Sequence, residues 1–148
     1  MTTRVGRDWA KLSPMEIPLL QAALVTYVAP WVQALELRVE RADDDGVVLR
    51  LPLRPQLARE GGMVCGQAMM AAADTCMLLA LMQHWGAFKP CTTVQLSTSF
   101  LKPLGGQDGV VHARMIRVGK SLAFGEIDIC GANDQRSVCR ATATYALL

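Results

Sequence analysis

Aromatic residues and charged residues are scarce in this sequence. Of its 148 residues, 5% are aromatic and 19% are charged, whereas 51% are hydrophobic. Disordered chains show the opposite balance, with few apolar residues and a high net charge, so the composition predicts a folded protein. The formal net charge is +2 and no basic tract is present, which argues against nucleic acid as a partner. Aliphatic residues, alanine and methionine must therefore build the core.

Histidine is scarce, and the cysteines show no paired motif. The five cysteines are odd in number and form no C-x-x-C pair, and neither His84 nor His112 has a second candidate ligand nearby in sequence. These features predict no zinc site and reduced thiols, which fits a cytoplasmic protein. The first residues lack the apolar segment of a signal peptide. The length fits one domain over residues 1–148, with about residues 1–12 loosely ordered.

The longest apolar stretch, residues 64–82, contains a single charge, Asp74, near its middle. A carboxylate at the centre of a membrane helix costs roughly 2.5–3.5 kcal/mol on insertion scales. The stretch is therefore predicted to be a helix inside a folded protein rather than a membrane span.

Hydrophobic spacing predicts an α+β protein. The expected order is a helix ended by Pro30, two strands joined by a turn, one long helix and four more strands. The last strands alternate apolar and polar residues, as antiparallel strands with one covered face do. The long helix is apolar on all sides, so one sheet cannot cover it and a partner subunit is expected. The predicted strands are 35–40, 47–53, 91–101, 110–118, 122–130 and 138–147, and the long helix is 66–85.

Asp74 is the first candidate for chemistry. A buried carboxylate needs a partner, and no Lys, Arg or His lies within a helical turn of it. It is either a general base or nucleophile in a cleft, or a structural aspartate at a subunit boundary.

The second candidate for chemistry is the glycine-containing loop that leads into the long helix and ends at Gly66. A helix N-terminus offers free N–H groups that can stabilise an oxyanion.

Three motifs carry a resemblance to a known family. The segment from Cys65 to Thr75 resembles the loop and helix H-G-G-x-x-x-x-x-x-D-T of PaaI-like hotdog-fold thioesterases, with Asp74 nine residues after the position of the His. Residues 92–103 resemble the family's strand that ends in F-L-[RK]-P, and residues 118–124 resemble its G-[RK]-x-x-x-F hairpin. Cys65, Gln67 and Arg59 replace the family's His, second Gly and Asn, as in a branch that reads R-x-G-G-x-V-S-G-P.

The resemblance implies a hotdog fold, in which an antiparallel sheet wraps around the long helix, and hydrolysis of an acyl-CoA thioester without a metal or other cofactor. It implies that Asp74 is the base or nucleophile and that the Gly66 N–H polarises the carbonyl. It also implies that Thr93, from the strand of the opposing subunit, positions the water or the carboxylate. The expected assembly is a homodimer with two sites at its interface, and pairing of two dimers stays open. The expected substrate contacts are Cys65, Gln67, Arg59, Met70, Lys102 and Lys120, with the lysines at the coenzyme A phosphates.

Two other functions stay open. Cys65, Gln67 and Arg59 depart from the commoner family pattern, which suits a non-catalytic protein that binds or senses acyl-CoA. A hotdog dehydratase or hydratase is the other alternative. Those enzymes usually pair a catalytic His with an acid, and no His occupies that position here.

Overall fold

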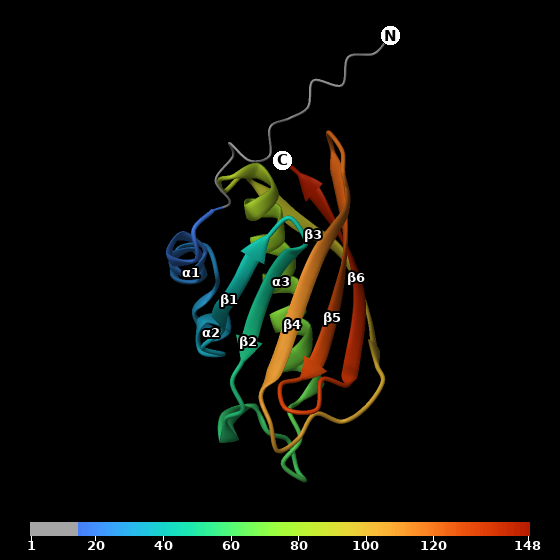
Figure 1. The fold of residues 1–148 in the computed structure, drawn as a ribbon. Coiled ribbons are helices and arrows are strands. Elements are labelled where there is room, and N and C mark those ends of the chain that lie inside the picture. Colours follow the sequence, from blue (N-terminus) through green and yellow to red (C-terminus); the bar gives the residue numbers. More distant parts are fainter. Residues whose placement is uncertain (1–14) are drawn as a thin grey trace.

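A computed structural model describes residues 15–148 and shows one six-stranded antiparallel sheet packed on one long helix (Figure 1). The strand order is β1-β2-β4-β5-β6-β3, so β1 and β3 form the two edges. The predicted α+β hotdog architecture is confirmed. The expectation for residues 1–12 lies outside the described residues. The elements are α1 (Ile17–Thr26), α2 (Pro30–Gln33), β1 (Arg38–Asp43), β2 (Gly46–Leu51), a 3-10 turn (Pro55–Leu57), α3 (Gly66–Trp85), β3 (Cys91–Phe100), β4 (Gly109–Val118), β5 (Leu122–Gly131) and β6 (Ser137–Leu147).

Helix α3 lies behind the sheet in the view of Figure 1 and contacts β2, β4 and β5. Gly86 ends it in the left-handed conformation, with φ of 75°, which glycine adopts without a Cβ clash. Within residues 15–148, no helix is long and apolar enough to cross a membrane. The helix supplies the centre of the hydrophobic core through Ala72, Ala73, Cys76, Met77, Leu79 and Leu81, all fully buried.

The first helix and the first strand differ from their predicted bounds. Helix α1 ends at Thr26, and Pro30 begins the short helix α2 instead of ending the first one. Proline suits this first position because its missing N–H is not needed there. Strand β1 begins at Arg38 rather than Leu35, because the chain is still in a turn after α2, where Leu35 N donates to Val32 O. The Gln21 side chain of α1 binds the backbone on both sides of Arg38. Its Nε2 donates to Leu37 O at 3.1 Å, and Val39 N donates to its Oε1 at 2.8 Å.

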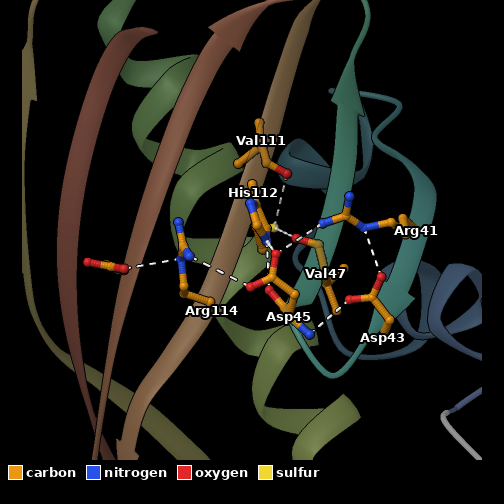
Figure 2. A network of polar contacts seen from close by, with 9 residues as sticks. Arg41, Asp43, Asp45, Val47, Val111, His112 and Arg114 are labelled. Atoms are coloured by element: carbon orange, nitrogen blue, oxygen red, sulfur yellow. Dashed lines mark hydrogen bonds and ion pairs between the residues drawn. The ribbon is translucent and has the colours of Figure 1, made fainter.

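The turn between β1 and β2 is tied to the outer surface of β4 (Figure 2). Gly46, with φ of 107°, has no room for a side chain, because a Cβ would lie 2.0 Å from Ala113 O. Asp45 lies 3.6 Å from both Arg41 and Arg114, and its carbonyl oxygen is 2.7 Å from His112 Nε2. These contacts fix the hairpin register over the sheet, on the face opposite α3.

Candidate active site

The Asp74 carboxylate is held by two hydroxyl groups. Thr93 Oγ1 donates to Asp74 Oδ1 at 2.8 Å, and the Tyr145 hydroxyl donates to the same oxygen at 2.7 Å. The Tyr145 hydroxyl also lies 2.9 Å from the backbone carbonyl oxygen of Asp74. Asp74 is partly exposed in the middle of α3, so solvent reaches it. This arrangement suits a carboxylate that takes part in chemistry.

Adjacent strands deliver the two donors. Thr93 of β3 and Tyr145 of β6 are direct partners in the antiparallel ladder. The ladder shifts register between Thr93 and Gln95, which marks a β-bulge beside the carboxylate. Bulges bend a strand and change the direction of its side chains, and they are common next to active sites.

One prediction about Thr93 is wrong. The family resemblance implied that Thr93 acts on Asp74 from the strand of an opposing subunit. The structure instead places the Thr93 hydroxyl of the same chain on the carboxylate. The reason lies in the sheet order: β3 returns along the chain to pair with β6, and the two strands pass the middle of α3 together.

The surroundings of Asp74 keep the neighbouring groups neutral. Burial raises the pKa of Tyr145 far above its usual value, and the Asp74 charge raises it further. Burial also raises the pKa of the Cys91 thiol, and the Asp74 charge adds to that shift. Tyr145 is only 4% exposed, so it remains a protonated hydrogen-bond donor at any physiological pH.

The start of α3 forms a second part of the site. Cys65 is the N-cap residue, and its side chain makes no capping hydrogen bond. The backbone N–H groups of the first helical turn, including that of Gly66, have no intrahelical acceptor. The loop before the helix is nonetheless fixed, because Cys65 N donates to Leu57 O and Val64 N donates to Leu104 O, both at 2.8 Å.

A pocket of about 280 Å³ opens at this helix start. The predicted catalytic residue Gly66 lines it together with two predicted substrate contacts, Arg59 and Lys102. Apolar side chains form the rest of the wall. They are Met63, Val64, Met69, Phe100 and Leu101, with Pro103 beside Lys102.

Other predicted residues lie elsewhere. Gln67 and Met70 are exposed on the same side of α3 as Asp74, between the helix start and the carboxylate. Lys120 is exposed in the turn between β4 and β5. The strand registers put that turn at the opposite end of the sheet from Lys102, roughly 30 Å away along ten-residue strands. The structure therefore does not bring the two lysines together within one chain.

Gly66 and Asp74 are also separated. Their positions differ by eight residues in one helix, and a helix rises about 1.5 Å per residue, so they are about 12 Å apart along the axis. One carbonyl group cannot contact both in the same chain. The chain therefore presents two partial sites, the helix start with Gly66, and the carboxylate with Thr93 and Tyr145.

The contact between Tyr145 and Asp74 was not predicted from the sequence. Tyr145 lies in the predicted strand 138–147, where apolar and polar residues alternate, and no role was expected for it. The available signal was chemical, because a buried tyrosine hydroxyl usually finds a hydrogen-bond partner. In a core built almost entirely from aliphatic residues, Asp74 was a candidate for that partner.

A scan against protein-family models matches residues 61–138 to the thioesterase superfamily. The chain belongs to the thioesterase superfamily. The matched segment runs from the glycine-containing loop through α3 and into β6, and it includes Gly66, Asp74 and Thr93. The predicted family is thereby confirmed, and thioester hydrolysis is the general class of activity.

Curated relatives are similar over most of their length. A protein of Thermoplasma acidophilum named "Putative esterase Ta0293" is 26% identical over 116 residues, covering 78% of this chain and 86% of the relative. A Thermoplasma volcanium protein named "Putative esterase TV1331" is 26% identical over 117 residues, covering 79% of this chain and 86% of the relative.

Solved structures share the fold. Thioesterase HI1161 from Haemophilus influenzae superposes with a TM-score of 0.80 at 18% identity, covering 92% of each chain. A mutant of the phenylacetic acid degradation protein PaaI from Thermus thermophilus gives a TM-score of 0.71 at 21% identity, covering 81% of this chain and 100% of the other. At these identities the comparison establishes the hotdog fold.

Proposed function

We propose that this protein hydrolyses an acyl-CoA thioester to the free acid and coenzyme A, with Asp74 as general base or nucleophile. The observation that carries the proposal is the Asp74 carboxylate itself. It lies partly exposed on an otherwise apolar helix, and two hydroxyl donors hold one of its oxygens. A carboxylate that is oriented in this way and reached by solvent is suited to activating a water molecule.

The reaction follows from these groups. As a base, Asp74 takes a proton from water while the water oxygen attacks the thioester carbonyl. The resulting oxyanion accepts a hydrogen bond from the Gly66 N–H at the positive end of α3. The C–S bond then breaks, and the coenzyme A thiolate leaves and takes up a proton. If Asp74 instead attacks directly, an anhydride forms with release of the thiol, and water then cleaves the anhydride.

A second copy of the chain completes the site in this proposal. Because Gly66 and Asp74 of one chain are too far apart for one carbonyl, the N–H of one copy would act with the Asp74 of another. Strand β3 lies at the sheet edge and exposes Val94 to 59%, so it offers a surface for pairing. We therefore propose an obligatory homodimer. Pairing of two such dimers would leave the proposed shared site unchanged.

The proposed substrate fits the pocket at the helix start. Met63, Met69 and Phe100 provide apolar walls for the acyl or pantetheine chain, while Arg59 and Lys102 can meet phosphate groups at its rim. Lys120, at the other end of the sheet, would reach a phosphate only on a substrate held by another copy. The substrate is proposed to lie along α3 and to contact Cys65, Gln67 and Met70. The proposed reaction uses no metal or redox cofactor.

The test is thiol release from a panel of acyl-CoA thioesters by wild type and Asp74→Asn. The amide keeps the shape of the side chain but loses its basicity, so turnover should fall ~10²–10⁴-fold. Asp44→Asn, which makes the same change in the exposed turn before β2, is the matched control and should retain activity. Near-normal turnover of Asp74→Asn on the best substrate would refute the assignment.

The same panel separates the other functions. Binding of acyl-CoA without thiol release would support a sensing protein, and hydration of an unsaturated acyl chain without thiol release would support a hydratase. Sedimentation across protein concentrations, measured alongside activity, tests the dimer. A fully active monomer would contradict the shared site.

A further inference from the structure

We infer that Tyr145 is a positioning residue for Asp74: its hydroxyl holds Oδ1, so that Oδ2 is the oxygen that meets water or substrate. This inference rests on the proposed function for its catalytic meaning. Its geometric basis is independent of the substrate. Among the described residues, both hydrogen bonds to the carboxylate, from Thr93 and from Tyr145, fall on Oδ1.

Tyr145 is placed to hold Asp74 rigidly. The tyrosine ring is 4% exposed in the core, on a strand paired on both sides, by β3 and by β5. Thr93, the other donor, lies opposite Tyr145 in the ladder and is itself exposed on the edge strand. Tyr145 is therefore the buried anchor of the carboxylate, and Thr93 is the donor closer to solvent.

The Tyr145 hydroxyl also has a choice of acceptors. It lies 2.7 Å from Asp74 Oδ1 and 2.9 Å from the Asp74 backbone carbonyl oxygen. A hydroxyl has one proton, so it donates to one acceptor at a time. While Asp74 is ionised, the charged oxygen is the stronger acceptor.

Once Asp74 has taken up a proton, or has been acylated, the Tyr145 proton can turn to the carbonyl oxygen. That oxygen has a second lone pair beyond the one used in the helix. Tyr145 thus keeps a hydrogen bond in each state of Asp74 without moving its ring. The bond to Oδ1 is strongest when the carboxylate is charged.

Two titratable groups respond to the Asp74 charge. Cys91 of β3 and Tyr145 of β6 both have a pKa raised first by burial and then by that charge. Along α3, the residues one turn away on either side are Met70, Ala71, Met77 and Leu78, none of which titrates. Among the described residues, the Thr93 and Tyr145 hydroxyls are therefore the side-chain groups that hold the Asp74 carboxylate.

The first experiment compares Tyr145→Phe with Tyr27→Phe. Tyr27 is 46% exposed and stacks on Phe88, so its variant makes the same chemical change away from the site. Tyr145→Phe should lower kcat on the order of 10- to 100-fold, as expected for loss of a hydrogen bond to a charged group, with KM changed much less. Tyr27→Phe should leave kcat and KM unchanged. A purely structural role would lower the melting temperature of Tyr145→Phe while the folded variant keeps the wild-type kcat, and that result would overturn the inference.

The second experiment does not depend on turnover. Carbon-13 NMR of carboxyl-labelled aspartate, recorded at neutral pH, reports on the hydrogen bonds of the Asp74 carboxylate, whose signal is assigned by its absence in Asp74→Asn. In Tyr145→Phe the chemical shift of this signal should change because Oδ1 loses one donor, whereas Tyr27→Phe should leave it unchanged. An unchanged chemical shift in Tyr145→Phe would refute the role of Tyr145. If no acyl-CoA releases thiol with wild type, the proposed function fails, but this chemical shift still decides the interaction.

Discussion

The Phe100 ring occupies the space beside Gly66 at the start of α3, since a Cβ on Gly66 would lie 3.3 Å from the Cζ atom of Phe100. The last residue of β3 therefore closes over the first residue of the helix. With no side chain at position 66, the backbone N–H there stays open to the pocket that both residues line. The absence of a side chain at this position matters for access to the helix dipole rather than for backbone conformation.

Gly66→Ala should retain the fold and lose activity. Alanine favours helix, and Phe100 is 48% exposed and can move by a few tenths of an ångström. The added methyl group would nonetheless narrow the approach to the N–H, so kcat/KM should fall by at least about tenfold, part of the ~10²–10³-fold effect of losing an oxyanion donor. Thiol release and thermal melting check the two effects separately. Full activity with an intact fold would show that the Gly66 N–H is not used.

Thr93 should matter through its hydroxyl and not through its shape. Thr93→Val keeps the β-branched form that suits a strand but removes the donor to Asp74 Oδ1. Its kcat should fall on the order of 10- to 100-fold. Thr93→Ser keeps the hydroxyl and should stay within roughly threefold of wild type. Equal rates for the Val and Ser variants would remove Thr93 from the site.

Cys65→Ser should stabilise the protein. Cys65 is the N-cap of α3 and makes no capping hydrogen bond, whereas serine is among the preferred N-cap residues. The free energy of unfolding should rise by about 0.5–1 kcal/mol, seen as a melting temperature a few degrees higher. Activity should remain within about tenfold of wild type, and mass spectrometry of quenched wild type should show no acylated Cys65. An acyl-Cys65 adduct together with an inactive Ser variant would make Cys65 the nucleophile.

Asp108 should contribute stability that depends on pH. The Leu53 N–H donates to its Oδ1 at 2.7 Å and Arg50 lies 3.1 Å from its Oδ2, and these two partners hold the pKa of Asp108 below its ordinary value. A group with a lowered folded pKa stabilises the fold above its unfolded pKa, near 4, and loses that effect as pH falls through the folded pKa. The difference in unfolding free energy between wild type and Asp108→Asn should therefore be largest at neutral pH and shrink below about pH 4. Denaturant unfolding at several pH values measures it, and a constant difference would contradict the role.

The sequence by itself determined the class of fold, most of the elements and the position of the carboxylate. Alternation of apolar residues predicted the later strands because each has one covered face. The long, mostly apolar stretch predicted α3 because that helix is largely buried. Asp74 stood out because it is the single charge in that stretch. These properties are local, so they can be read along the chain.

The tertiary structure decided what surrounds that carboxylate. Tyr145 and Thr93 lie 71 and 19 residues from Asp74, and only the pairing of β3 with β6 brings their hydroxyls to the same oxygen. Sheet order also overturned the expectation that Thr93 acts across subunits, and the turn after α2 moved the start of β1. Register and packing depend on contacts between distant segments, and spacing along the sequence does not encode which distant side chains will meet.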